Sequence, residues 1–415
     1  MNSALSTSEC FARIDELEPR LHAFQALRRE EALAEAAGVD PALPLAGVPV
    51  AIKDNVDVAG LPTRQGSAAT PDRPVERDDE LVRRLRDAGC VVIGKTQMPE
   101  LAVWPFTEPE AFPAPQNPLH AGLTPGGSTG GGAVAVAAGM AALALGSDGG
   151  GSLRVPAACC GLVGLKPGPG IVPLAGGASR HWYGMTEFGP LARTAAEAAL
   201  MLDILAGTAT YREPRPPTQP LRIAISAGHP SVGVRAKPAI RAGLSRVSRV
   251  LAEAGHRVTT ARVPYPPTLG MRFSNRWLAG IAQDAEGLPA ERLEERTRKM
   301  ARRGAKIGPR VKPAGEDPFG ARMRRWFADY DVLVTPVLTR PPVHIGTWQG
   351  KGWVRTMLGV ANWIYTVPWN LARLPAASVP FGGTALQLVG PEGSEGTLLA
   401  LAVQIEQLDE DDASV

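Results

Sequence analysis

The sequence predicts an α/β protein in which a central mixed β-sheet is flanked by helices on both faces. Between residues 48 and 93, the alternating Val48, Val50 and Ile52 indicate a strand, DELVRRLRDA an amphipathic helix and CVVI a buried strand. Residues 221–264 show the same succession, with LRIAIS, a helical stretch and HRVTTARVP. A strand, a helix and a second strand in this order are typical of βαβ units and therefore of an α/β fold.

The remaining elements follow along the chain. The segment before residue 40 is rich in Ala, Leu and Glu, which predicts helices. Within the apolar stretch 132–145, a buried helix is expected from residue 133 to residue 145. Other segments are assigned by the same patterns: a helix at 196–205, strands at 330–336, 375–381 and 386–390, and a helix at 395–406. Residues 267–317 are basic and contain several prolines, and they predict no clear element.

We expect the whole chain, residues 1–415, to form a single domain. The proline-rich EPRPPTQP (Glu213–Pro220) is the strongest candidate for a domain boundary. However, the strands predicted on its two sides are alike, and neither half contains an obviously closed core. One sheet that uses strands from both halves is therefore the preferred arrangement.

Composition and charge argue against several classes of protein. The formal net charge of +3 is small and dispersed, which disfavours nucleic-acid binding, and the mixed-charge run Glu291–Arg302 is interpreted as a solvated helix face. The apolar stretch 132–145 is too short to span a bilayer, and the N-terminal residues do not resemble a signal peptide. The four cysteines form no C-x-x-C motif, so we expect reduced thiols and a cytoplasmic protein.

Two glycine-rich loops are the candidate functional segments: PGGSTGGG (Pro125–Gly132) and GSDGGGSLRVP (Gly146–Pro156). Glycines leave consecutive backbone N–H groups uncovered, and such a nest can bind a phosphate or stabilise the oxyanion of acyl transfer. The phosphate interpretation is disfavoured, because neither loop has the lysine of a P-loop and no acidic ribose ligand is evident.

Acyl transfer by a serine in these loops requires a base. None of the six histidines lies in a motif typical of a Ser-His-Asp triad, and no His/Cys cluster has the spacing of a metal site. Lysine is the remaining candidate, and it can act as a base when burial or neighbouring positive groups lower its pKa. Lys53, at the end of an apolar strand, is placed for this role.

Three segments of the chain together resemble the amidase signature family. They are GVPVAIKDNVDVAGLPTRQGSA (Gly47–Ala68), TPGGSTGGGAVAVAAG (Thr124–Gly139) and ALGSDGGGSLRVPAACCGLVGLKP (Ala144–Pro167). The spacings between Lys53, Ser128 and Ser152 are also similar to the catalytic spacings of the family, and weaker matches extend over residues 10–405. The combination is far more specific than either glycine loop alone.

The resemblance implies an amide hydrolase of the EC 3.5.1 type with the family fold and a catalytic core at about residues 40–210. Ser152 matches the nucleophile, Ser128 the bridging serine on a cis peptide bond after Gly127, and Lys53 the base that receives the proton through Ser128. Backbone N–H groups are implied as the oxyanion hole, namely those of Gly149, Gly150, Gly151 and Ser152. Thr129, Asp148 and Arg154 match supporting positions, and neither a metal nor an organic cofactor is implied.

The sequence departs from the family pattern at several positions. Thr129 stands where many relatives have a second serine, Gly132 where they often carry serine, and Arg373 where glycine is common, which puts the local turn in doubt. The segment Phe381–Gln387 is shorter than the hairpin of relatives. Two other residues in family-like stretches, Lys95 and Cys160, are interpreted as structural.

The substrate of this chain is expected to be a small-molecule amide held by poorly matched segments. By position these are residues 104–112, 178–186, 271–307 and 348–369. Five aromatic side chains are candidates to pack an apolar or aromatic acyl group: Trp104, Phe106, Trp182, Trp353 and Trp363. The alternatives left open are a glutaminase-type subunit of a transamidation complex, an inactive binding protein on the same fold, and a homodimer instead of a monomer.

Overall fold

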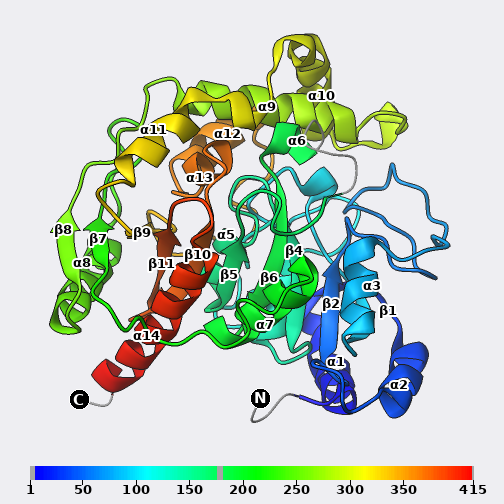
Figure 1. Cartoon of the computed structure of the whole chain (residues 1–415). Helices are drawn as coiled ribbons and strands as arrows, with labels where there is room; N and C mark the ends of the chain where they lie inside the picture. The colour runs from blue at the N-terminus through cyan, green and yellow to red at the C-terminus, as the bar shows by residue number, and fades with distance from the viewer. Residues whose placement is uncertain (1–4, 175–180, 414–415) are drawn as a thin grey trace.

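One large mixed sheet organises the structure, a computed structural model that describes residues 5–174 and 181–413 (Figure 1). Within these residues the sheet has 11 strands in the order β1-β3-β2-β4-β6-β5-β10-β11-β9-β7-β8. Their bounds are β1 Phe24–Leu27, β2 Pro49–Lys53, β3 Val91–Thr96, β4 Leu143–Asp148, β5 Val163–Lys166, β6 Glu187–Ala192, β7 Arg222–Ile225, β8 Arg257–Thr260, β9 Val332–Pro336, β10 Ala376–Phe381 and β11 Thr384–Val389.

The sheet combines parallel and antiparallel pairs, as predicted. β2 runs parallel to β3 and β4, and β7 runs parallel to β8 and β9. The strands between these groups pair antiparallel, from β4 with β6 through to β11 with β9. The two predicted strand–helix–strand successions therefore lie in one sheet, in which β10 and β11 from the C-terminal part of the chain help to join them.

Helices cover both faces of the sheet because strand side chains alternate between two hydrophobic cores. In β2, for example, Val50 and Ile52 point into one core and Ala51 into the other. The first core is closed by α3 (Glu80–Asp87), α7 (Ala195–Ala206), α8 (Pro238–Glu253) and α14 (Glu395–Ala413). The second is closed by α1 (Thr7–Leu21), α2 (Arg29–Gly38), α4 (Gly130–Ala137) and α5 (Arg154–Cys160), together with the helices described next. The predicted α/β fold with helices on both faces is confirmed.

The segment 267–317, in which the sequence suggested only a solvated helix face at Glu291–Arg302, is largely helical. It forms α9 (Leu269–Asp284), η2 (Ala290–Arg292), α10 (Glu295–Ile307), η3 (Gly308–Arg310) and η4 (Ala314–Glu316). With α6 (His181–Gly184), α11 (Pro318–Trp326), α12 (Trp353–Ala361) and α13 (Val367–Leu371), these helices lie across one end of the sheet (Figure 1). This layer covers the end at which the two glycine loops lie.

Two predictions about the N-terminal half were wrong. The helix expected up to residue 145 ends at Ala137, because Gly139 adopts a left-handed conformation, and Leu143–Asp148 form the central strand β4. A short, fully buried apolar run fits a strand or a helix equally well, so periodicity did not separate them. The helical segment before residue 40 is interrupted by the four-residue strand β1, of which Phe24, Ala26 and Leu27 pair with β3 at the sheet edge.

The hairpin that the sequence suggested to be short is reduced to a two-residue turn. β10 and β11 pair from Ala376–Val389 to Phe381–Thr384, and only Gly382 and Gly383 connect them. Both glycines have positive φ angles, 56° and 71°, as a type I′ turn requires. The compact hairpin therefore follows directly from the Gly-Gly pair.

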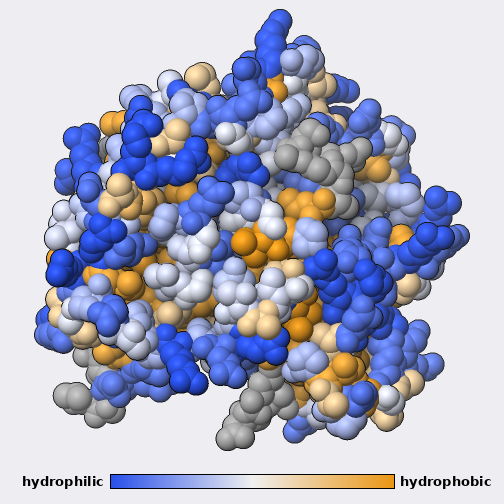
Figure 2. All heavy atoms as spheres, viewed as in Figure 1, coloured by the Kyte–Doolittle hydropathy of each residue, from blue (hydrophilic) through white to orange (hydrophobic). Residues whose placement is uncertain are grey.

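The surface of the view in Figure 2 is mainly hydrophilic, with apolar patches lying between polar side chains. None of the helices in the described part of the chain is both long and apolar enough to cross a bilayer. The four cysteines are free and buried, and burial raises the pKa of each thiol. Their thiolate forms are therefore suppressed, including that of Cys160, which lies 3.6 Å from the Pro125 carbonyl oxygen.

Candidate active site

Lys53 ends β2 inside the protein and has two hydroxyl groups as neighbours. Its side chain has no exposed surface, and Nζ lies 2.7 Å from Ser128 Oγ and 2.8 Å from Ser147 Oγ. Burial lowers the pKa of Lys53 to about 7, although the negative charge of Asp148 opposes this shift. A lysine with this pKa is largely neutral in mildly alkaline solution and can then accept a proton.

Ser128 and Ser152 come from the two glycine loops, which touch each other through the backbone. The Thr129 N–H donates to the Ser152 carbonyl oxygen at 3.2 Å. The Gly127–Ser128 peptide bond is cis, as the resemblance implied. Ser128 is fully buried whereas Ser152 retains 7% exposure, and both line one cavity. The structure thus brings Lys53, Ser128 and Ser152 together at one site.

Asp148 and Arg154 hold the Ser152 loop from beneath. Arg154 donates to both Asp148 carboxylate oxygens at 2.9 Å, and both side chains are fully buried. Burial alone would raise the pKa of Asp148, but the Arg154 charge and hydrogen bonds from Arg154 and Asn370 lower it below its ordinary value. Asp148 is therefore a permanent carboxylate that accepts loop N–H groups, those of Gly151 (2.6 Å) and Leu153 (3.2 Å).

This arrangement changes the set of N–H groups available to an oxyanion. The sequence placed Gly151 among the oxyanion donors, but its N–H is used within the loop by Asp148 Oδ1. Since one N–H makes one strong hydrogen bond at a time, the N–H groups of Gly149, Gly150 and Ser152 remain as the candidates. Gly151 instead keeps the loop in shape, with a φ of 129° that disfavours any side chain.

Two residues from the C-terminal part complete the support, and sequence reasoning missed both. Thr366 donates its hydroxyl to the Gly150 carbonyl oxygen at 2.6 Å, and Asn370 donates to the carbonyl oxygen and Oδ1 of Asp148 at 2.8 and 2.9 Å. Arg154 donates to the same segment, at the Thr366 carbonyl oxygen (3.0 Å) and Asn370 Oδ1 (2.6 Å), and also to Gln387 Oε1 of β11. No local motif marks these positions, because the contacts join segments more than 200 residues apart.

Ser147 and Asn55 were also missed, although both lie inside the recognised segments. Ser147 Oγ lies 2.8 Å from Lys53 Nζ and accepts a hydrogen bond from Asn55 Nδ2 at 3.2 Å. Their closeness in sequence to Lys53 and Asp148 was the available signal. The lysine is thus held between two serine hydroxyls, of which only Ser128 belongs to the predicted triad.

Each of the three loop glycines is approached closely by a different neighbour. A Cβ atom on Gly149 would lie 2.7 Å from Trp182 Cε3, and one on Gly150 would lie 3.0 Å from Phe273 Cζ. A Cβ atom on Gly151 would collide with the Thr366 hydroxyl. Glycine at these positions therefore allows the loop to pack directly beneath two aromatic side chains and against Thr366.

We expect Gly151→Ala to reduce activity by about 10²-fold or more, because the new methyl group must displace Thr366 and distort the loop amides. The substitution also meets a backbone φ of 129° that alanine disfavours. Gly38→Ala is a matched control, since nothing lies within 4 Å of its Cβ position. Steady-state kinetics of both purified variants, with thermal unfolding as a check of folding, would test this; near wild-type kcat/KM for Gly151→Ala would contradict it.

The departures at Thr129 and Gly132 have a common steric reason. A Cβ atom on Gly132 would lie only 3.1 Å from the Thr129 methyl group, so the threonine methyl occupies the space that a serine at 132 would need. The Thr129 hydroxyl donates to the Ser147 carbonyl oxygen at 3.4 Å, so a hydrogen bond is retained. Arg373 adopts the left-handed conformation with a φ of 58°, so the turn is formed despite the loss of glycine.

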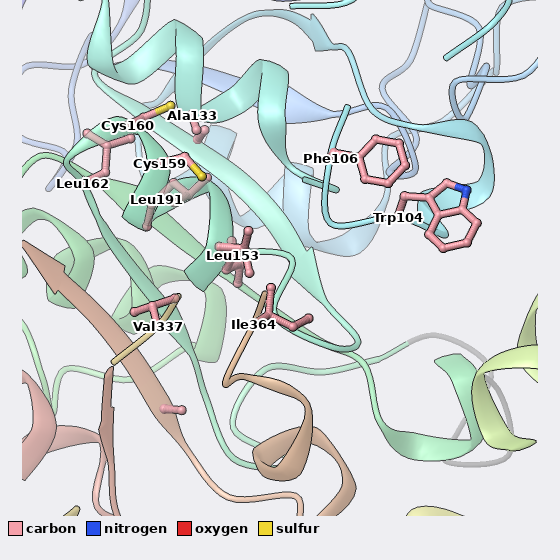
Figure 3. Packing of buried hydrophobic residues seen from close by; sticks show 14 of the residues in the cluster. Trp104, Phe106, Ala133, Leu153, Cys159, Cys160, Leu162, Leu191, Val337 and Ile364 are labelled. Atoms are coloured by element: carbon pink, nitrogen blue, oxygen red, sulfur yellow. The ribbon is translucent and has the colours of Figure 1, made fainter. Parts of the chain in front are cut away.

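An apolar cavity of about 110 Å³ opens beside Ser152. Of the predicted aromatic residues, Trp104 and Trp182 line it, whereas Trp353 lines a different cavity and Trp363 is fully buried. Phe106 does not line this cavity but stacks on Trp104, with 5.6 Å between the two ring centroids (Figure 3). The other apolar walls were not predicted individually, and they include Leu269, Phe273, Trp277, Met357, Val360, Ile364 and Val367. Residues 178–180 of the predicted pocket segment lie outside the described residues.

Core packing fixes the position of Ser152 from its other side. Leu153 is fully buried and lies between the Cys159–Leu191 region and Ile364 (Figure 3).

Lys95 does not belong to the site. Its ammonium group forms a buried ion pair with Asp54 at 3.0 Å, as expected for a structural residue. Among the residues that the structure describes, no group of three or more His, Cys, Asp or Glu side chains is arranged to hold a metal ion.

Comparison with known proteins shows which family the chain is similar to. A family model described as Amidase matches residues 6–399. The chain is 42% identical to "Putative amidase AmiB2" of Mycobacterium bovis over 95% of this chain and 90% of that protein. It is 37% identical to a glutamyl-tRNA(Gln) amidotransferase subunit of Natronomonas pharaonis, over 86% of this chain and 94% of that protein.

Solved structures show the same fold. The structure of 6-aminohexanoate cyclic dimer hydrolase superimposes with a TM-score of 0.85 and 28% identity, covering 97% of this chain and 92% of that one. The family match extends over nearly the whole chain and includes both glycine loops and Lys53. The protein therefore belongs to the amidase signature family and is an amide hydrolase.

Proposed function

We propose that the protein hydrolyses a carboxylic amide to the acid and ammonia or an amine, through an acyl-enzyme on Ser152. The observation that carries this proposal is the buried contact between Lys53 Nζ and Ser128 Oγ, because Ser128 lines the same cavity as Ser152. A serine hydroxyl is a weak nucleophile unless a base removes its proton during attack. Neutral Lys53 supplies that base, and Ser128 connects it to Ser152.

In the first step, Ser152 Oγ forms a bond to the amide carbonyl carbon. Its proton passes to Ser128 Oγ while the Ser128 proton passes to Lys53 Nζ, which becomes charged. The carbonyl oxygen becomes an oxyanion, and the N–H groups of Gly149, Gly150 and Ser152 stabilise it. Each donor of this kind typically contributes about 10²–10³-fold to the rate.

In the second step, the carbon–nitrogen bond breaks and the proton returns from Lys53 through Ser128 to the leaving nitrogen. The acyl group remains as an ester on Ser152 Oγ. A water molecule then attacks the ester with the same proton transfers, which releases the acid and restores the serine. We place the catalytic core at residues 40–210, and the segment that contains Thr366 and Asn370 keeps its nucleophile loop in position.

The cavity beside Ser152 favours an uncharged substrate. Its described lining contains no Asp, Glu, Lys or Arg side chain, and four of its residues are Trp104, Trp182, Phe273 and Trp277. Free glutamine as the substrate would bring an α-ammonium and an α-carboxylate group into these surroundings, and unpaired charges are costly to bury. The glutaminase-type alternative is therefore disfavoured, although a subunit of that kind is among the relatives.

This function is tested by incubating the enzyme with phenylacetamide and, separately, with L-glutamine. We expect phenylacetate and ammonia in equal amounts, and a kcat/KM for glutamine that is lower by about 10²-fold or more, since its charges find no partners in the cavity. Both products are quantified, the acid by chromatography and the ammonia enzymatically. Faster hydrolysis of glutamine would favour the transamidation alternative, and hydrolysis of no amide in a broad panel would contradict the proposal.

A further inference from the structure

Ser152 lies where two cavities of different chemistry meet. The apolar cavity described above measures about 110 Å³. A second cavity of about 300 Å³ is lined by polar groups that include Asn55, Gln65, Ser147, His181 and Asp284. Ser152, Ala102 and Trp182 line both cavities. An amide also has two sides, the acyl group and the amine, so the two cavities offer each side a separate place.

Trp182 forms the partition between the cavities and is held firmly. Its side chain packs against two glycines: a Cβ atom on Gly149 would lie 2.7 Å from Cε3, and one on Gly280 of α9 would lie 2.5 Å from Cδ1. Its indole N–H donates to Asp284 Oδ2 at 2.8 Å. Because these contacts hold the side chain in place and Trp182 lines both cavities, it lies between the apolar cavity, which Phe273 and Trp277 line, and the polar one.

The position of Ser128 decides which side of the amide enters which cavity. Ser128 lines the polar cavity and is absent from the lining of the apolar one. In the proposed mechanism, Ser128 returns the proton to the leaving nitrogen, which must then lie within hydrogen-bond reach of its hydroxyl, about 3 Å. The amine therefore leaves through the polar cavity, and the acyl group points into the apolar one.

The polar cavity is large enough to hold an amine bigger than ammonia. Its volume of about 300 Å³ is roughly ten times the 30 Å³ that one water molecule occupies in the liquid. Asn55 Oδ1 is buried and has no hydrogen-bond partner among the described residues, while its Nδ2 is held by Ser147. A buried acceptor without a partner is unfavourable unless a ligand supplies a donor, and an N–H or O–H group of the amine is such a donor.

We infer that the preferred substrate is a secondary amide that joins a small apolar acyl group to a polar amine. The inference rests on the proposed function and adds the orientation of the substrate to it. The apolar cavity also limits acyl size, since an engineered apolar cavity of about 150 Å³ holds one benzene molecule. At about 110 Å³ the apolar cavity is smaller than this, so a short chain fits inside it and a single-ring acyl group extends partly to its opening beside Ser152.

Two isomeric amides test this orientation without any mutation. N-(2-hydroxyethyl)phenylacetamide has the apolar group on the carbonyl and the polar group on nitrogen, and the phenethylamide of glycolic acid has the same atoms with the two groups exchanged. We expect kcat/KM for the first to exceed that for the second by about tenfold or more, a margin typical of an apolar pocket that discriminates by size and polarity. We also expect a higher kcat/KM for N-(2-hydroxyethyl)phenylacetamide than for phenylacetamide, whose leaving group is ammonia.

Two phenylalanines provide matched variants, because Phe273 lines only the apolar cavity and Phe188 only the polar one. Phe273→Ala should lower kcat/KM for phenylacetyl amides about tenfold. The ratio of kcat/KM between amides that differ only in the amine should stay within about twofold of its wild-type value. Phe188→Ala should change the ratio of kcat/KM between amides that differ in the amine, and it should leave the ratio between amides that differ in the acyl group unchanged. Thermal unfolding identifies any variant that does not fold. If a variant does not fold, the comparison of the two isomeric amides with the wild-type enzyme still tests the orientation.

The outcomes separate this inference from the proposed function. Equal rates for the two isomers, or a preference for the glycolic amide, would overturn the orientation while leaving amide hydrolysis in place. Cleavage of neither isomer by an enzyme that reacts with a fluorophosphonate would overturn it as well. Failure of both fluorophosphonate labelling and amide hydrolysis would instead contradict the proposed function.

Discussion

Replacing Ser152 with alanine should lower kcat by about 10⁴-fold or more, because removing the nucleophile of an acyl-enzyme mechanism eliminates its covalent path. The effect should fall on kcat rather than on folding. The Ser152 side chain keeps 7% exposure, and the Asp148–Arg154 pair that shapes the loop lies beneath it. The variant should therefore retain the wild-type thermal midpoint and still bind substrate.

Ser245→Ala is a suitable control for this experiment, since Ser245 is an exposed residue of α8 whose hydroxyl bonds within its helix, to the Arg241 carbonyl oxygen. Its kinetics should match those of the wild type. Substrate binding to Ser152→Ala can be measured by calorimetry with an amide that the wild type hydrolyses. A variant that folds and keeps more than about a tenth of wild-type kcat would show that another group attacks the amide.

Activity should rise as the pH is raised through about 7 and then level off, because the mechanism requires neutral Lys53 and burial lowers the pKa of Lys53 to about 7. At pH 5 the amine is protonated and cannot accept the Ser128 proton. Above pH 8 it is mainly neutral. Lys53→Ala should reduce kcat/KM by about 10²–10⁴-fold at neutral pH and remove this inflection from the residual activity.

The Lys53→Ala variant is needed to assign the inflection to Lys53, because other groups have pKa values in the same pH range. Burial raises the pKa of Glu187 to about 7 and that of Glu294 to about 8. If either carboxyl group caused the inflection, it would persist in Lys53→Ala. Lys312→Ala is the matched lysine control, since that side chain is 75% exposed. A flat wild-type profile between pH 5 and pH 9 would contradict the assignment of Lys53 as the base.

The recurring βαβ pattern was readable from the sequence because its strands and amphipathic helices carry local periodicity. Val50, Ile52 and the helix that follows residue 79 fall where the pattern placed them. Leu143–Leu145 did not, because a central strand buried on both faces loses the alternation that distinguishes it from a buried helix. The short edge strand β1 was hidden for another reason, since its stability comes from pairing with β3 rather than from its own residues.

The catalytic candidates were readable because three continuous segments contain them. The structure places Lys53 and Ser128 in contact and puts Ser152 in the same cavity as Ser128. What the sequence could not supply is the set of contacts that arise only on folding. Thr366 and Asn370 reach the Ser152 loop from more than 200 residues away, and their roles depend on where α13 packs.

The substrate cavities depend even more on tertiary structure. Phe273 and Trp277 belong to α9, in a segment whose elements the sequence did not predict, yet they form the apolar wall beside Gly150 and Ser152. Trp363 was equally plausible by composition and lies wholly inside the core. Composition alone could predict an apolar pocket but not its lining or the position of the polar cavity.

The identity of the nucleophile is tested most directly by treating the protein with an alkyl fluorophosphonate at pH 8 and locating the adduct by peptide mass spectrometry. We expect one adduct per chain on Ser152 Oγ, no labelling of Ser152→Ala, and slower labelling of Lys53→Ala. A stable adduct on another residue, or labelling that persists in Ser152→Ala, would contradict it.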